Sequence, residues 1–346
     1  MLGRVKCRNH LRHSRGLMSA RPHPPAKPQP LIGAQVSTAG GLTPVPRRAV
    51  ELGAEVIQIF DTNPRTWRPR EVSPQELISF VAEMDRNRLP LFLHTIYLIN
   101  LASPDEALRA RSRQALVHAL LLGALTGATG VVTHVGSHRG EGFSRVRAYV
   151  IETVVAAYRE AAASLAKAAD APGEKKALIP PLLLETAAGM GHTVGGSLAE
   201  LSELVEAIAG ARPDGVAAPG ICLDTAHLFA AGYPVHEAAG LEALIAELDT
   251  LGLLERVGLV HLNDSKTAFG SHRDYHENLG RGHIGYEALA RVVGHPRLAG
   301  VPFVLEVPGL DGHGPDAPNV RLAKTMREEP VVPPPGPAPD AKRPTD

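Results

Sequence analysis

The stretch "VVTHVGSHRGEGFSRVRAYVIETVVAAYREAAASLAKAA", residues 131–169, contains the repeating unit from which the fold can be predicted. It begins with a short apolar run, continues through a polar segment with glycines, and ends in a long alanine-rich stretch. The apolar residues of 144–169 recur at helical spacing, whereas the short run is typical of a strand buried on both faces. A strand followed by a helix is therefore predicted.

Seven further apolar runs have the same character and alternate with segments rich in Ala, Leu and Glu. Buried strands that alternate with helices indicate a parallel sheet covered by helices. Eight such units in roughly 280 residues predict a closed (β/α)8 TIM barrel, and no GxGxxG of a dinucleotide-binding fold follows the first run. The eight runs are 31–37, 56–60, 91–95, 131–136, 182–186, 220–224, 257–264 and 303–307.

Composition divides the chain into a catalytic barrel at 31–325 and two tails that are expected to be disordered. The tail at 1–30 is rich in Pro and Arg, and the tail at 326–346 is rich in Pro. A transit peptide, a DNA-binding arm and a later start at Met18 are alternatives for the first. The two cysteines are too far apart for a disulfide framework, and no apolar run could span a bilayer, so we expect a cytoplasmic protein.

The formal net charge of +0 is unevenly distributed. Residues 1–30 contain seven Lys and Arg and no acid, whereas residues 31–330 contain 27 basic and 34 acidic residues. An acidic core is a poor binder of polyanions. Bound metal cations would reverse this conclusion, because they can be the largest local charges in a site.

Six successive strands, from the third to the eighth, carry a His or a carboxylate near the carboxyl end, where barrel enzymes build their active sites. Taken singly, such a histidine is more often structural, and such a carboxylate often caps the next helix. Together, the carboxylates would repel one another without cations. A mixture of His, Asp and Glu without Cys suits zinc or manganese, so we predict a multinuclear metal site. The residues are His94, His134, Glu185, Asp224, His261 and Glu306.

Three more candidate ligands lie beside these strands. Asp274 and His276 have the i, i+2 spacing that directs two side chains to one side of extended backbone, and with His227 they could chelate one ion. The other titratable groups of 259–285 are expected to be solvated or to support ligands, with Asp264 orienting one. They are Asp264, His272, Glu277 and His283.

In these sequence contexts the candidate residues resemble the endonuclease IV family of apurinic/apyrimidinic endonucleases, over residues 31–310. The resemblance implies hydrolysis of the phosphodiester 5′ to abasic sites in duplex DNA, with a 3′-hydroxyl and a 5′-deoxyribose phosphate as products. It also implies a monomer that acts on the nucleoid. The matching stretches are "IGAQVSTAGGL", "HTIYLINLASP", "THVGSH", "LLLETAAGMGHTVGG", "CLDTAHLFAAGY", "HLNDSKTAFGSHRDYHENLGRGHIG" and "FVLEVPG".

The resemblance implies three Zn²⁺ ions, with Mn²⁺ as an alternative at one site. The implied ligand sets are His94, His134 and Glu185; Glu185 as a bridge, Asp224, His261 and Glu306; and His227, Asp274 and His276. The groups expected to carry catalysis are His134, Glu185, Asp224 and Glu306.

An abasic site has no base to read, so recognition must use the shape and deformability of the duplex. The resemblance implies DNA contacts by Arg65 after the second strand and by Tyr97 and Leu98 after the third, and Trp67 near Arg65 is a further candidate. Apolar wedges of this kind kink duplex DNA. The residues alone favour the alternative that Tyr97 and Leu98 pack on the next helix and that the arginines are solvated.

Two positions depart from the family pattern. Gln35 replaces a histidine and is expected to change supporting or DNA contacts, and Thr186 replaces an asparagine and is expected to loosen the support of Glu185.

A sugar isomerase or epimerase on the same barrel is the alternative function, and the Asp274–His276 pair argues against it. A noncatalytic protein that binds damaged DNA would be expected to lack at least one of the nine ligands, and none is missing here.

Overall fold

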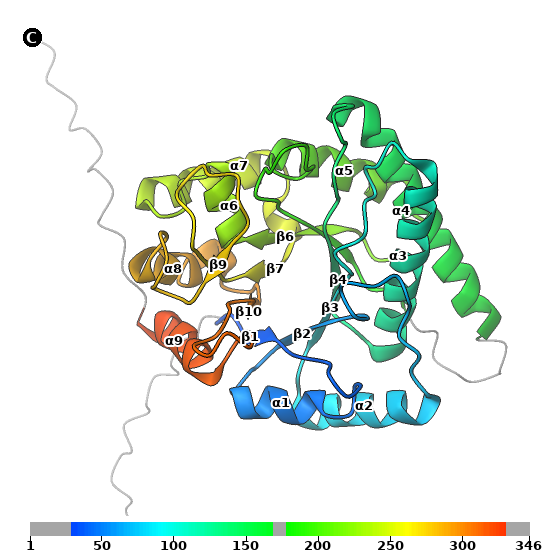
Figure 1. Cartoon of the computed structure of the whole chain (residues 1–346), viewed down its shortest axis with the longest axis horizontal. Coiled ribbons are helices and arrows are strands. Elements are labelled where there is room, and N and C mark those ends of the chain that lie inside the picture. The colour runs from blue at the N-terminus through cyan, green and yellow to red at the C-terminus, as the bar shows by residue number, and fades with distance from the viewer. Residues whose placement is uncertain (1–28, 169–177, 330–346) are drawn as a thin grey trace, which may run out of the picture.

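Each of the eight apolar runs forms one strand of a closed parallel barrel in the computed structural model (Figure 1), which describes residues 29–168 and 178–329. The predicted (β/α)8 barrel is confirmed, and most of each predicted tail lies outside the described residues. Neighbouring strands follow the order β1-β10-β7-β6-β5-β4-β3-β2. The barrel strands are β1 (Ile32–Gln35), β2 (Ile57–Phe60), β3 (Leu91–His94), β4 (Gly130–Thr133), β5 (Leu182–Glu185), β6 (Gly220–Asp224), β7 (Val257–His261) and β10 (Phe303–Leu305).

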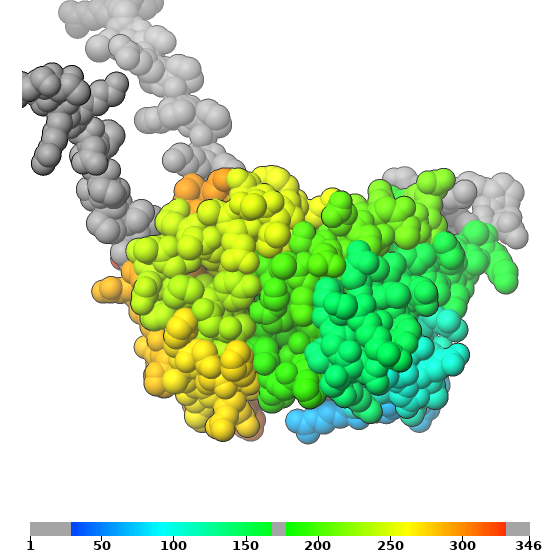
Figure 2. Space-filling view, turned by 90° about the horizontal axis from the view of Figure 1, so that it is seen from above, coloured from blue at the N-terminus to red at the C-terminus, as the bar shows by residue number. Residues whose placement is uncertain are grey.

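Helices surround the barrel, and Figure 2 looks onto the wall formed by the segments from α4 to α7. None of the described helices is both long and apolar enough to cross a membrane. The α-helices are α1 (Val45–Leu52), α2 (Pro74–Asn87), α3 (Glu106–Thr126), α4 (Phe143–Ala168), α5 (Leu198–Ala211), α6 (Thr225–Ala231), α7 (Ala238–Thr250), α8 (Tyr286–Val293) and α9 (Ala317–Glu328). Two 3₁₀ turns are η1 (Leu254–Arg256) and η2 (Pro296–Leu298).

Local sequence signals explain where these helices begin and end. Ser73 caps α2 by accepting the Glu76 N–H, and Asp105 caps α3 by accepting the Ala107 N–H. Such caps satisfy backbone donors that have no partner inside the helix. The helix α3 ends at Gly127, whose φ of 65° is readily adopted by glycine.

The barrel interior consists of an apolar layer and, above it, a polar layer. Alternate residues of a strand point into the barrel. The apolar layer is a separate buried cluster made of Val56, Phe92, Val132, Leu183, Cys222, Leu259 and Val304. The residue two positions further along each of these strands is polar, and these residues are Gln58, His94, His134, Glu185, Asp224, His261 and Glu306. The period of the strands thus places a ring of polar side chains on an apolar base, at the carboxyl end of the barrel.

A small antiparallel ribbon, β8 (Asp264–Ser265) and β9 (His276–Glu277), follows β7. Asp264 pairs with Glu277, and Ser265 pairs with His276. The sequence did not predict this ribbon. It returns the chain to the rim of the barrel, where His276 joins the polar layer.

Candidate metal centre

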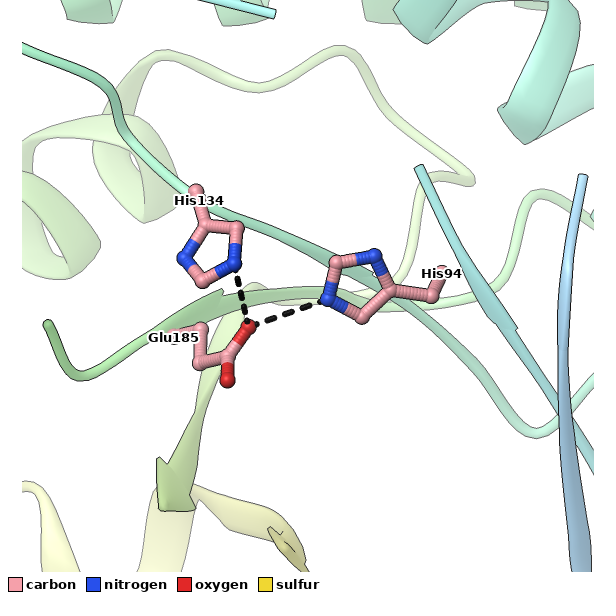
Figure 3. A group of neighbouring side chains, drawn as sticks. All are labelled: His94, His134 and Glu185. Carbon is pink, nitrogen blue, oxygen red and sulfur yellow. Dashed lines mark hydrogen bonds and ion pairs between the residues drawn. The ribbon is translucent and has the colours of Figure 1, made fainter. Parts of the chain in front are cut away.

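The first group of candidate ligands contains His94, His134 and Glu185 (Figure 3). Nε2 of His94 and Nε2 of His134 lie 3.1 and 3.4 Å from the same Glu185 oxygen, Oε2. His94 Nδ1 lies 2.7 Å from the carbonyl oxygen of Thr95. Because a carbonyl only accepts, Nδ1 carries a proton, and Nε2 is the nitrogen left to coordinate an ion when the ring is neutral.

The second group contains Glu185, Asp224, His261 and Glu306. Nδ1 of His261 lies 2.9 Å from Glu185 Oε1, 3.4 Å from Glu306 Oε2 and 3.8 Å from Asp224 Oδ2. Glu185 therefore directs one carboxylate oxygen to the first group and the other to the second. This is the geometry of a carboxylate that can bridge two ions.

The third group contains Asp224, His227 and His276, with Asp274 beside it. Oδ1 of Asp274 lies 3.1 Å from His227 Nε2 and 3.3 Å from His276 Nε2. Oδ2 of Asp224 lies 3.6 Å from His276 Nε2. Asp224 thus borders both the second and the third group. It also caps α6 by accepting the His227 N–H at 2.8 Å, which fixes the helix that carries His227.

The donor atoms fit divalent cations. Nε2 of His227 and Nε2 of His276 are buried, yet neither makes an aligned hydrogen bond within residues 29–168 and 178–329. The other nitrogen of His227, Nδ1, donates to the carbonyl oxygen of Thr186 at 2.8 Å. Buried polar atoms without partners are costly, and ion coordination would satisfy them. Imidazoles and carboxylates without thiolates suit zinc and manganese.

The close packing of charges shifts several pKa values. Burial alone would raise the pKa of Glu185, but His134 and His261 hold it well below its usual range. Burial would lower the pKa of His276, but Asp224 and Asp274 raise it to about 9. In the absence of metal, the imidazoles therefore supply the positive charge that the carboxylates require.

The pKa values of the other histidines divide in the same way. Burial lowers the pKa of His134, whereas nearby carboxylates outweigh burial at His94, His227 and His261 and raise their pKa values. Burial would raise the pKa of Asp274 as well, but the rings of His227 and His276, which lie within ion-pair distance of its carboxylate, hold it well below its usual range.

Asn263 supports the ligands but was not singled out in the sequence. Its side-chain amide donates to Asp224 Oδ2 at 2.7 Å, and its oxygen accepts the Glu306 N–H at 2.8 Å. The prediction that Asp264 orients a ligand is wrong. The carboxylate of Asp264 instead accepts backbone N–H groups from residues 265, 282, 284 and 285, and so holds the loop after the ribbon. For Asn263, the available sequence signal was a side-chain amide two residues after His261, the histidine that ends its strand.

Thr186 is well placed to support the ligands, which differs from the loosening expected there. Its hydroxyl accepts the Asp224 N–H at 2.9 Å, and its carbonyl accepts from His227 Nδ1. The threonine thus holds Asp224 at the end of β6 and His227 in α6. His272, Glu277 and His283 are not members of any of the three groups.

A groove of about 900 Å³ runs beside the polar rim, and its lining includes Gln35, Arg48, Arg65 and Arg70. Oε1 of Gln35 is buried without a hydrogen-bond partner among the described residues. Arg65 is exposed, whereas Arg48 donates to the carbonyl oxygens of Ser37 and Ala39. The groove therefore combines positive charge with an acceptor that has no partner of its own.

The other candidate DNA contacts differ in exposure. Tyr97 is 58% exposed, and its ring meets the rings of Phe60 and His94 edge-on. Leu98 and Trp67 are only partly exposed and pack on the core, and the guanidinium of Arg111 lies 4.7 Å above the Trp67 ring. Tyr97 is thus the more available of these side chains for contact with a substrate.

The fold and the polar rim define a TIM-barrel enzyme, and the family model described as "Xylose isomerase-like TIM barrel" matches residues 46–328. A probable endonuclease 4 of Halothermothrix orenii is 34% identical over 294 residues, which cover 85% of this chain and 99% of the relative. A probable endonuclease 4 of Nitratidesulfovibrio vulgaris is 36% identical over 297 residues, with 86% and 99% covered. The chain belongs to the endonuclease IV family and is a nuclease.

Solved structures agree with this assignment. Endonuclease IV from Thermus thermophilus has a TM-score of 0.71 and 37% identity, and the match covers 86% of this chain and 99% of that one. A D-tagatose 3-epimerase-like protein has a TM-score of 0.55 at 18% identity, which shows the shared barrel alone.

Proposed function

We propose that this nuclease hydrolyses the phosphodiester 5′ to abasic sites in duplex DNA, leaving a 3′-hydroxyl and a 5′-deoxyribose phosphate. The observation that carries the proposal is the convergence of nine donor side chains into three adjoining groups that share Glu185 and Asp224. A sugar isomerase on this barrel needs one or two ions and has no use for the third group. The endonuclease 4 names of the relatives agree with a DNA substrate.

Three divalent cations, zinc by preference, would be held by the three groups, with Asp274 completing the third. When bound, such ions neutralise phosphoryl oxygens and lower the pKa of water toward neutrality. Glu185 holds the first two groups next to each other through its two oxygens. Asp274, with 46% of its side chain exposed, lies at the open side of the third group, where a DNA backbone can approach.

The chain supplies orientation and substrate contacts around these ions. Arg65 in the groove offers a phosphate contact, and Tyr97 beside the first group offers a ring that can fill the space of the missing base. Catalysis then rests on cations that neutralise the phosphodiester and on side chains that position it.

The test is cleavage of an end-labelled duplex that contains one abasic site, with the same duplex lacking the lesion as the control. We expect one nick 5′ to the lesion, a 3′ end that a polymerase extends, loss of activity on prolonged chelation, and three metal equivalents per chain by elemental analysis. A metal-loaded protein that leaves the duplex intact and epimerises a ketose would overturn the proposal.

A further inference from the structure

We propose that Gln58 is a positioning residue that sets the coordinating nitrogen of His261 and the direction of the Glu306 carboxylate. The inference rests on the proposed metal site and deepens it. Gln58 is fully buried on β2, and its side chain reaches residues 203 and 248 positions away in the sequence. Its partners lie on β7 and just after β10, two strands that neighbour each other in the barrel.

Gln58 lies in the polar layer, but unlike the His, Asp and Glu residues there it carries a neutral amide, which is not a typical zinc ligand. It lies two residues after Val56 of the apolar layer, as each candidate strand ligand lies two residues after its own apolar residue. An aliphatic residue at this position would extend the apolar layer beneath the site. A buried amide is tolerated only when its donors and acceptor have partners.

The hydrogen bonds of Gln58 fix its own orientation first. Its Nε2 lies 2.7 Å from Glu306 Oε1, and its Oε1 lies 3.0 Å from His261 Nε2. An ionised carboxylate can only accept, so the amide must present its NH2 to Glu306. The amide oxygen then faces His261, and an oxygen there can only accept the Nε2 proton.

This arrangement leaves His261 Nδ1 as the nitrogen that can bind an ion. Nδ1 faces Glu185 Oε1 at 2.9 Å and Glu306 Oε2 at 3.4 Å, which are members of the same group. Glu306 likewise uses Oε1 for Gln58 and keeps Oε2 for the group. One amide thereby orients two ligands of the second group from outside it.

The other histidines of the site are oriented by main-chain carbonyls. His94 and His227 donate from Nδ1 to the carbonyl oxygens of Thr95 and Thr186, and both direct Nε2 to the ligands. His261 is oriented the other way round, and its partner is a side chain. A substitution of Gln58 can therefore remove the hydrogen bond that orients His261 and leave the backbone unchanged.

The experiment compares the full-length wild type with Gln58→Met, which keeps the length of the side chain and removes both hydrogen bonds. Each protein is titrated with Zn²⁺ against a competing chelator. We expect Gln58→Met to weaken one of the three zinc equivalents by about 10–100-fold and to leave the other two within about twofold. On abasic duplex, kcat should fall while KM stays unchanged.

The matched control is Asn319→Leu in α9, which removes another buried amide, one that hydrogen-bonds the side chains of Asn278 and Asp316. This variant should be less stable to heat but should bind all three zinc equivalents as the wild type does. Unchanged zinc affinities in Gln58→Met would overturn the inference, as would an equal weakening of all three equivalents. A wild type that binds no zinc would instead overturn the proposed function, and the inference with it.

A second measurement needs no variant and decides the case if Gln58→Met does not fold. Nitrogen-15 spectra of histidine in the zinc-loaded wild type report which ring nitrogen carries the proton. We expect His261 to be protonated on Nε2 and bound through Nδ1, whereas His94 and His227 are bound through Nε2. A His261 bound through Nε2 would overturn the inference while leaving the proposed function intact.

Discussion

The candidate ligands in the barrel strands and those in the loops reach the same site by different means. Those of the first and second groups lie in, or directly after, strands whose register is fixed by neighbours on both sides. In the third group, His227 lies on the seven-residue helix α6 and His276 on the two-residue strand β9, while Asp274 precedes that strand. The first arrangement depends on the barrel, and the second depends on caps and a short ribbon.

Glu185 gives the largest expected effect, because it joins the two strand-borne groups. Glu185→Gln keeps the shape but replaces one oxygen with an amide nitrogen that cannot bind metal. We expect loss of the first two metal equivalents and a fall in kcat of at least about 10³-fold on abasic duplex, because two of the three cations that would neutralise the phosphodiester and lower the pKa of water are lost. The third equivalent should remain, as measured by elemental analysis.

The control for this variant is Glu237→Gln, which changes an exposed carboxylate outside the three groups. It should retain three metal equivalents and wild-type kcat. If Glu185→Gln kept all its metal and lost less than tenfold in kcat, the strand-borne groups would not share a bridging carboxylate.

His276→Ala tests the loop-borne group separately. The side chain lies between Asp224 and Asp274, so its loss should release one metal equivalent and spare the other two. We expect kcat to fall by about 10²-fold, because one of the three cations that would neutralise the phosphodiester is lost while the other two would remain. His283→Ala, in the same segment but outside the groups, is the control. Release of all three equivalents would show that the third group cannot be separated from the barrel.

The same contrast explains how much the sequence could predict. All eight strands followed from apolar runs, and six of them have a candidate ligand at or directly after the carboxyl end, because the period of a strand fixes which side chains point inward. Gln58 escaped notice since it lies inside such a run and its two partners are more than 200 residues away. The ribbon β8–β9 is two pairs long, too short for any periodicity. Thr186 supports its neighbours partly through its carbonyl oxygen, which no side-chain pattern encodes.

The pH dependence of metal binding should separate the two regions again. In the metal-free protein the pKa of His276 is about 9 and that of His227 is raised, so both rings carry an extra proton at pH 7. In the second group only His261, with its raised pKa, does so. A metal must displace these protons, and therefore binding strengthens as the pH rises and weakens as it falls.

Around pH 7 the third group should gain about two logarithmic units of affinity per pH unit, and the second group about one, because the raised pKa values leave these rings protonated there. Calorimetry in buffers with different ionisation enthalpies measures the protons released per ion. The variant His276→Ala removes the third site and leaves the proton release of the second for comparison. Equal proton release by the two groups would contradict the assignment of two charged imidazoles to the loop-borne group.

Tyr97 gives the smallest expected effect, because it lies outside both sets of ligands. Its ring meets His94 edge-on and remains 58% exposed, so it is open to a substrate without holding a metal. Tyr97→Ala should lower the preference for abasic over intact duplex by about fivefold, the loss expected for one stacking contact. Competition binding measures the preference, and metal content should stay at the wild-type value.

Tyr97→Phe keeps the ring and should keep the preference. If it behaved like the alanine variant, the hydroxyl rather than stacking would carry recognition. If Tyr97→Ala discriminated as well as the wild type, the ring would serve to cover His94, and recognition would belong to the groove with Arg65.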